Sequence, residues 1–281
     1  MRVRSPAPLA TLALAVVTLA VAALACGPAA AHDLWISSTG TGAEARVVVN
    51  YGHPGDRPPP LADKVLDIAA TTASGSTSLA PRLAPAVVDG TFVLAAPWSG
   101  DALLAARYDN GFWVETPDGT WRNSSRLVYQ DAKAALWSIK FAKALVGPGA
   151  PWRTVLGHEL EIVPLADPAA LTVGSRLPVR VLFRGKPLAG IAVERGDGVT
   201  PMAEKDMPTF RTNEAGIAEI PIARVGPHLL AVDHDVTPPK LPTLADRDLY
   251  NATLMLDVPP RRGSRHGRGA DTRNRPEGDH S

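Results

Sequence analysis

Apolar and polar residues alternate in short runs along most of the chain, which is the pattern of β-strands that bury one face. In one such run Ala45, Val47 and Val49 fall on the same side, and the run ends at the turn sequence His-Pro-Gly-Asp over 53–56. Residues 131–145 are the one segment that permits a helix of useful length, although part of it fits a strand equally well. Further runs, separated by Pro, Gly, Asp and Asn, predict strands over 64–69, 76–79, 91–95, 102–108 and 113–116.

A second block of alternating runs follows residues 164–170, whose prolines and small residues indicate a linker or a turn at a domain edge. Strands of this block are expected over 177–183, 188–194, 209–212, 217–222, 228–232 and 254–258. Many short strands at regular spacing favour a sandwich or barrel over a parallel α/β sheet. We therefore predict an all-β protein with two β-sandwich domains, a Trp-containing one over 32–165 and an Ig-like or transthyretin-like one over 166–259. The Arg-rich segment 260–281 has no apolar face, so we expect a disordered basic tail there.

The first 31 residues have the features of a secretory signal peptide. Arg2 and Arg4 precede an apolar run over 9–25, and small residues lead up to Ala31. Cleavage after Ala31 gives a periplasmic or secreted chain that begins at His32 and has no transmembrane segment. Two alternatives stay open: cleavage before Cys26 with a lipid anchor on that residue, and an uncleaved membrane anchor.

Charge and cysteine content narrow the classes of function. The chain has 29 basic and 28 acidic residues, and this balance argues against a nucleic-acid partner. Its one cysteine, Cys26, lies in the predicted signal peptide, so the mature chain offers no disulfide, no thiolate nucleophile and no cysteine-based zinc site. We find no serine-nucleophile elbow, phosphate-binding glycine loop, zinc-binding histidine pair on a helix or dinucleotide fingerprint. We therefore predict that the protein is not an enzyme.

The strongest candidate for chemistry is His32. As the first residue of a mature chain it offers an α-amine, with a pKa of about 7.7–8.0, beside an imidazole, and the two can chelate one metal ion. Imidazole suits Cu, Ni, Co and Zn. Two nitrogens do not bind an ion tightly, so we expect further ligands from His53 in the turn and His234 at a strand end. Asp33 or Asp233 is expected to orient them from outside the coordination shell.

The other histidines have simpler interpretations. His158 shares a predicted strand face with apolar residues and is expected to be a buried, hydrogen-bonded core residue, although a ligand role stays open. His228 begins an apolar strand and is predicted to be structural. His266 and His280 fall in the predicted tail.

A few other side chains carry alternatives. Met202 and Met207 flank a Pro-rich loop, where two methionines usually pack the loop but could form a thioether site for Cu(I). Asp131, Lys133, Lys140 and Lys143 are expected to form a solvated face. All six Trp lie within residues 35–152, and we interpret them as core and rim residues, with a sugar-binding platform as the alternative.

Several short motifs, taken together and in order, resemble the bacterial secreted family known as domain of unknown function 4198. They span residues 31 to about 258 and comprise Ala-His-Asp-Leu-Trp-Ile at 31–36, Tyr-Gly-His-Pro at 51–54, Phe-Ala-Lys-Ala-Leu-Val at 141–146, Gly-His-Glu-Leu-Glu-Ile-Val-Pro at 157–164, Gly-Lys-Pro-Leu-Ala-Gly at 185–190 and Asp-Leu-Tyr-Asn-Ala-Thr-Leu at 248–254. The resemblance implies a periplasmic location, and many members are labelled accessory proteins of nickel or cobalt uptake. It implies His32, His53 and His234 as the metal-binding positions.

These observations lead to one prediction and two alternatives. The protein is expected to bind a divalent transition metal, Ni or Co with Cu also open, and to deliver it to a membrane metal transporter. The first alternative is a non-catalytic envelope module that binds a protein or a polysaccharide. The second is a copper-dependent redox enzyme built on the amine–imidazole pair.

Overall fold

The computed structural model describes residues 32–260. The predicted signal peptide at 1–31, with the lipid-anchor alternative at Cys26, lies outside these residues, and so does the predicted tail from residue 261 onward.

The described chain is all-β, as the sequence predicted. Between residues 32 and 260 it has no α-helix and five short 3-10 helices, none of them long and apolar enough to cross a membrane. The ambiguous segment 131–145 forms a strand, β9 (Ala134–Val146). The 3-10 helices are η1 (Gly42–Glu44), η2 (Ala62–Lys64), η3 (Ala80–Arg82), η4 (Pro168–Ala170) and η5 (Glu204–Asp206).

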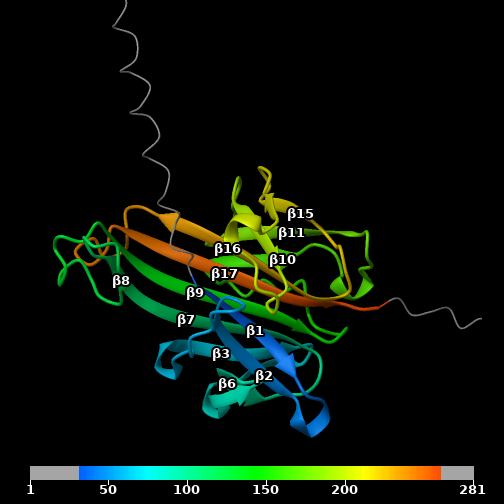
Figure 1. The fold of residues 1–281 in the computed structure, drawn as a ribbon. Coiled ribbons are helices and arrows are strands. Elements are labelled where there is room, and N and C mark those ends of the chain that lie inside the picture. Colours follow the sequence, from blue (N-terminus) through cyan, green and yellow to red (C-terminus); the bar gives the residue numbers. More distant parts are fainter. Residues whose placement is uncertain (1–31, 261–281) are drawn as a thin grey trace, which may run out of the picture.

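A nine-stranded sheet runs through the middle of the molecule in the order β14-β13-β16-β17-β9-β7-β3-β4, with β8 paired to β7 (Figure 1). Its strands besides β9 are β3 (Val65–Thr72), β4 (Gly75–Ser78), β7 (Ala102–Glu115), β8 (Trp121–Arg122), β13 (Ala192–Gly196), β14 (Thr209–Arg211), β16 (Gly226–Val236) and β17 (Arg247–Val258). All neighbours in this sheet are antiparallel except β17 and β9, which run parallel in its centre.

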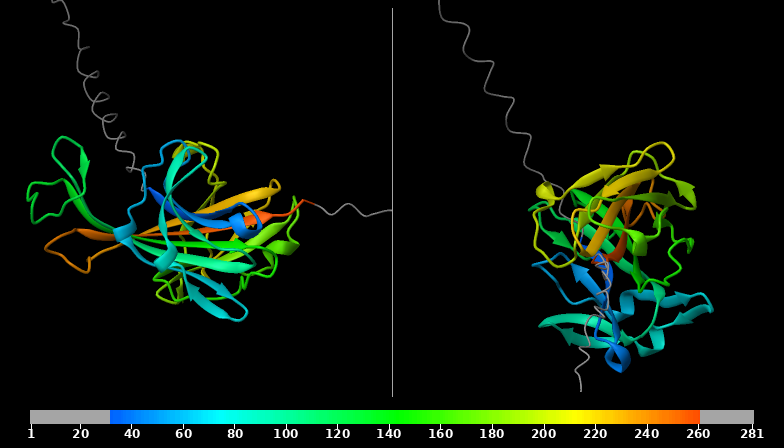
Figure 2. Two further views of the ribbon diagram at one scale, coloured as in Figure 1. Left: turned by 90° about the horizontal axis from the view of Figure 1, so that it is seen from below. Right: turned by 90° about the vertical axis from the view of Figure 1, so that its right-hand side faces the viewer.

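Two four-stranded sheets cover opposite faces of the large one (Figure 1, Figure 2). The first has the order β1-β2-β6-β5 and is formed by β1 (Asp33–Thr39), β2 (Arg46–Gly52), β6 (Thr91–Pro97) and β5 (Ala84–Val88). The second is formed by β10 (Leu160–Pro164), β11 (Arg176–Phe183), β12 (Lys186–Pro187) and β15 (Ile217–Pro221). We call the first the β1 sheet and the second the β11 sheet.

Each small sheet encloses its own hydrophobic core against the large sheet, because side chains of a strand point alternately to its two faces. On β9, Ala142 and Ala144 belong to the core under the β1 sheet, while Ile139 and Phe141 belong to the core under the β11 sheet. The central strands are therefore buried on both sides, which explains their nearly continuous apolar sequences.

The predicted domain boundary between residues 165 and 166 falls between β10 and η4. Strands from both sides of that boundary share the large sheet, and they meet directly where β9 pairs with β17. The two sandwiches thus have one sheet in common.

The expectation that Lys140 and Lys143 lie on a solvated face is wrong. Both side chains are 1% exposed, because they lie on β9 in the centre of the large sheet. Asp131 and Lys133, which precede the strand, are exposed as expected.

Candidate functional site

The turn that carries His53 follows directly from its sequence. Pro54 and Gly55 occupy the two central positions of a four-residue turn, where proline fixes one backbone angle and glycine, at φ +98°, adopts the left-handed region. Two backbone hydrogen bonds close the turn, from the His53 nitrogen to the Asp56 oxygen at 2.9 Å and from the Asp56 nitrogen to the His53 oxygen at 3.0 Å. The predicted turn at 53–56 is confirmed.

Strand pairing places His32 next to this turn. β1 and β2 are antiparallel neighbours with Asp33 opposite Gly52. The residue before Asp33, His32, and the residue after Gly52, His53, therefore lie opposite each other at the end of the two strands. Their ring centroids are 5.4 Å apart, with 68° between the ring planes. His32 Nε2 is 3.8 Å from an Asp56 carboxylate oxygen, and its ring also contacts Tyr51 edge-on at 5.2 Å.

One nitrogen of the His53 ring is buried and makes no hydrogen bond. Its Nε2 is shielded from solvent and has no hydrogen-bond partner. Buried polar atoms are normally paired, and one without a partner needs an explanation such as an absent ligand or ion. At His32, burial and the nearby His53 lower the pKa of the ring, so His32 is neutral and able to coordinate a metal at pH 7.

A row of polar side chains lies beneath the two histidines, on the face of the large sheet that meets the β1 sheet. Register aligns Lys140 on β9 with Asn251 on β17, and Asn251 with Asp233 on β16. The Asn251 amide nitrogen donates to Asp233 Oδ1 and to Asp33 Oδ1, each at 2.8 Å. One amide therefore links two carboxylates from different sheets.

The charged groups of this row are one lysine and two carboxylates. Burial lowers the pKa of Lys140, and it raises the pKa of Asp33 and that of Asp233, the latter to about 6. Asp233 is exposed to solvent at one end of this row, whereas Lys140 and Asn251 are buried. Two carboxylates and one lysine therefore share this row, and burial shifts the pKa of each toward its neutral form.

The third predicted ligand, His234, lies elsewhere. Successive side chains of β16 point to opposite faces, so Asp233 faces the β1 sheet while His234 contacts Phe183 of the β11 sheet, with ring centroids 4.6 Å apart. The structure thus brings His32 and His53 together and places His234 on the opposite face of the large sheet. Within residues 32–260, no three His, Asp or Glu side chains are arranged to hold a metal ion by themselves.

The other candidate residues differ in their surroundings. His228 is structural as predicted, with its ring 2% exposed and its Nδ1 3.0 Å from the Gly226 oxygen. His158 precedes β10 rather than lying on a strand face; its ring packs on Phe141 at 5.2 Å, and its buried Nδ1 lacks the expected hydrogen bond. Trp35 is buried in the core, and the other five Trp are half-buried.

Sequence reasoning missed Lys140 and Asn251. The signal that could have identified them is a polar residue at an inward position of a long apolar run, since the strands around both are otherwise apolar. Of the two predicted outer residues, Asp33 lies next to His32, and Asp233 is joined to Asp33 through the Asn251 amide.

Comparison with known proteins places this chain among bacterial relatives of unassigned function. The sequence model described as domain of unknown function DUF4198 matches residues 29–236, well over half of the chain. An uncharacterized protein of Haemophilus influenzae is 27% identical over 205 residues, which cover 70% of this chain and 78% of the relative.

Proposed function

The chain belongs to the DUF4198 family, and from that premise and the geometry beside His53 we propose that it binds a divalent transition metal at its mature N-terminus. The observation that carries the proposal is the buried Nε2 of His53, which has no hydrogen-bond partner. The His53 ring centroid lies 5.4 Å from that of His32. Cleavage after Ala31 would free the α-amine of His32. The ligands would then be that amine, the His32 imidazole and the His53 imidazole.

The free α-amine of His32 supplies one of the three nitrogens of this donor set, so two side chains are enough to complete it. Three neutral nitrogens bind first-row divalent ions in the order Cu²⁺ above Ni²⁺ above Co²⁺, and supply would decide which ion is carried. Asp33 and Asp233 lie behind the site and favour positive charge there through their carboxylates. His234 is not part of this proposal, because it lies on the other face of the large sheet.

The site is accessible from outside, which suits an ion that is handed on. The His32 side chain is 34% exposed and that of Asp56 is 81% exposed. We therefore retain delivery to a membrane metal transporter as part of the proposal. Its test is metal accumulation by cells that carry either the native protein or the His53→Ala variant, and equal accumulation would count against delivery.

The binding itself is tested by titrating Ni²⁺ and Cu²⁺ into chains with defined N-termini. The chain that begins at His32 should bind both ions, while a chain that keeps Ala31 and the variant His53→Ala should each bind at least about 10–100-fold more weakly, because loss of a ligand costs no less than loss of an outer-shell partner. His234→Ala is the matched control and should bind as the native chain does. Equal affinity of the His32 and Ala31 chains would overturn the proposal, and intact mass measurement of the exported protein would locate the cleavage.

A further inference from the structure

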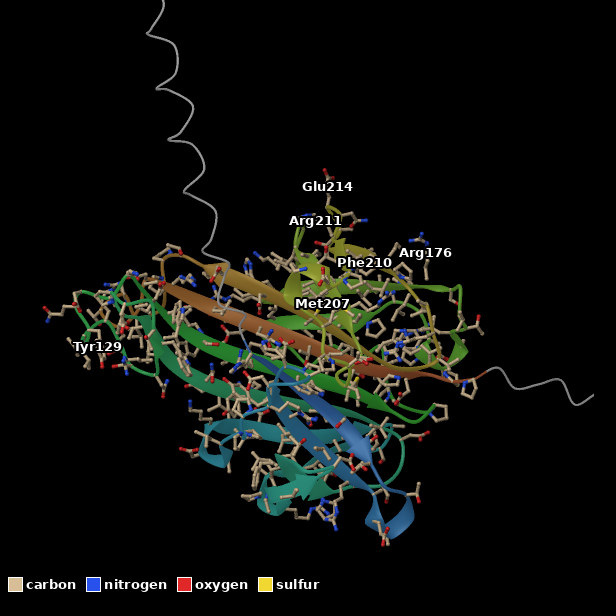
Figure 3. All side chains as sticks on the ribbon, viewed as in Figure 1. Tyr129, Arg176, Met207, Phe210, Arg211 and Glu214 are labelled. Carbon is tan, nitrogen blue, oxygen red and sulfur yellow. The ribbon has the colours of Figure 1, made fainter. Side chains whose placement is uncertain are left out.

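A small cavity of about 120 Å³ is lined in part by the His53 turn. It lies between that turn and the loop that joins β13 to β14, and its lining includes Asp33, His53, Met202 and Met207. Figure 3 labels Met207 and shows it over the large sheet, just before Phe210 of β14. The cavity thus combines one imidazole with two thioethers.

The loop that carries the methionines is held in place at its start. The Asp197 carboxylate accepts hydrogen bonds from the backbone nitrogens of Val199 and Thr200 at 2.7 and 2.6 Å, and from the Thr200 hydroxyl at 2.7 Å. Arg224 Nη2 also lies 3.1 Å from Asp197 Oδ2. These contacts fix the chain that leads into Met202.

The same loop packs directly on the His53 turn. A Cβ placed on Gly55 would lie 3.3 Å from Cγ of Pro201, so turn and loop are in van der Waals contact. The turn with His53 and the loop with the methionines therefore pack on each other beside the cavity.

Met202 differs from a methionine that only fills space in a core. Met255 is 8% exposed inside the core under the β1 sheet, as a gap-filling residue should be. Met202, in contrast, is 45% exposed at the edge of the cavity. Loop packing does not explain a thioether left exposed at a cavity that His53, whose buried Nε2 has no hydrogen-bond partner, also lines.

We propose that this cavity binds a soft univalent cation, Cu(I), through the thioethers of Met202 and Met207 and the imidazole of His53. Thioethers favour Cu(I), and they bind harder divalent ions such as Ni²⁺ poorly. The site shares His53 with the divalent site proposed above but uses neither the α-amine nor the ring of His32. The two proposals can therefore fail separately.

The test compares Cu(I) and Ni²⁺ affinity in the same set of chains, all beginning at His32 unless stated. Cu(I) is measured anaerobically by competition with a chromophoric Cu(I) chelator, and Ni²⁺ by calorimetric titration. The variant Met202→Leu/Met207→Leu should lose at least about 10–100-fold in Cu(I) affinity, the cost of changing outer-shell partners alone, and keep its Ni²⁺ affinity, because leucine conserves volume but has no ligating atom. The chain that keeps Ala31 should show the reverse, and His53→Ala should lose both ions.

Met255→Leu is the matched control and should change neither affinity. A second measurement follows the methyl signals of 13C-labelled methionine while Ag⁺, a redox-inert mimic of Cu(I), is added. The signals of Met202 and Met207 should shift and that of Met255 should stay in place. Unchanged Cu(I) affinity in the double leucine variant, an equal loss in Met255→Leu, or Ag⁺ shifts at Met255 alone would each overturn this site and leave the divalent site untouched.

Discussion

Two lysines on one strand are buried on opposite faces of the same sheet, and each lies near carboxylate groups from other elements. Lys140 faces the β1 sheet, near Asp33 and Asp233, and Lys143 faces the other side, where its Nζ is 2.8 Å from Glu161 Oε1. Glu161 also accepts the backbone nitrogens of Leu156 and Gly157, at 2.8 and 3.1 Å. A charge buried this deeply is tolerated only while its partner is present.

We expect Lys143→Met to lower the free energy of unfolding by about 3–5 kcal/mol, because it leaves the Glu161 carboxylate buried without its cation. Adding Glu161→Gln should recover part of this loss, since the amide carries no charge and its one oxygen still accepts one of the two backbone hydrogen bonds. Urea unfolding at pH 7 measures both variants. A double variant no more stable than Lys143→Met would contradict the assignment.

A second residue-scale prediction concerns pH. Burial lowers the pKa of His228 below its usual value, so the ring is neutral in the folded protein and takes up its proton more readily in the unfolded chain. Its contribution to stability is therefore complete above about pH 6.5 and is lost as the pH falls through the lower folded pKa.

We expect His228→Asn to flatten the dependence of unfolding free energy on pH between 7.5 and 5.5. One proton is involved, so the slope changes by at most about 1.4 kcal/mol per pH unit. His234→Asn, with a half-exposed ring on the same strand, should flatten it less. Parallel curves for the native chain and His228→Asn would count against the interpretation.

The candidate site could be predicted from the sequence where it depends on neighbours along the chain. His32 follows the predicted cleavage site and His53 lies in a recognisable turn, and the structure brings these two together. The placement of His234 depends on strand parity, since one step along β16 separates the two faces of the sheet. Lys140 and Asn251 join the site only through the pairing of β9 with β17, residues more than a hundred positions apart, which no local pattern reveals.

At the scale of elements, the turn after β2 is the most sensitive feature near the histidines. Gly52 has φ +107°, and a Cβ there would lie 2.3 Å from the Asp56 oxygen that closes the turn. Gly90 also has a positive φ, +74°, but a Cβ there would meet nothing within 4 Å.

Gly52→Ala should therefore destabilise the protein by more than about 2 kcal/mol and weaken metal binding through His53, whereas Gly90→Ala should cost about 1 kcal/mol from backbone strain alone. Thermal unfolding and Ni²⁺ titration of the two variants provide the comparison. Equal costs, or unchanged binding in Gly52→Ala, would show that the turn does not position His53.

Most strands were predictable because alternation and turn residues mark them locally. The segment 131–145 was ambiguous because β9 is buried on both faces, and its sequence has no period that separates strand from helix. The strand expected over 188–194 begins at Ala192 instead, and Gly190, with φ +73°, lies in the preceding turn. The parallel pairing of β17 with β9 could not be inferred, since it joins elements that no short connection links.

For the whole molecule, the shared sheet has a measurable consequence. Because β9 and β17 pair through nine register positions, neither sandwich can lose its strands without exposing the core of the other. We expect a single unfolding transition. The six Trp lie within residues 35–152, so their fluorescence reports on the first half of the chain, while circular dichroism reports on all strands.

The two thermal unfolding curves should coincide, and the calorimetric and van't Hoff enthalpies should agree. A transition seen by circular dichroism but absent from fluorescence would show that the second half unfolds independently. It would also support a division of the chain near residue 165.

The position of β17 has a further consequence for biosynthesis. The last described strand does not add to an edge: it lies between β16 and β9, in the centre of the large sheet. A growing polypeptide therefore lacks the middle of its sheet until translation reaches residue 258, and both cores stay open until then. A nonsense codon shortly before that point would truncate β17, the strand that contributes to both cores, whereas one shortly after it would leave every described strand intact.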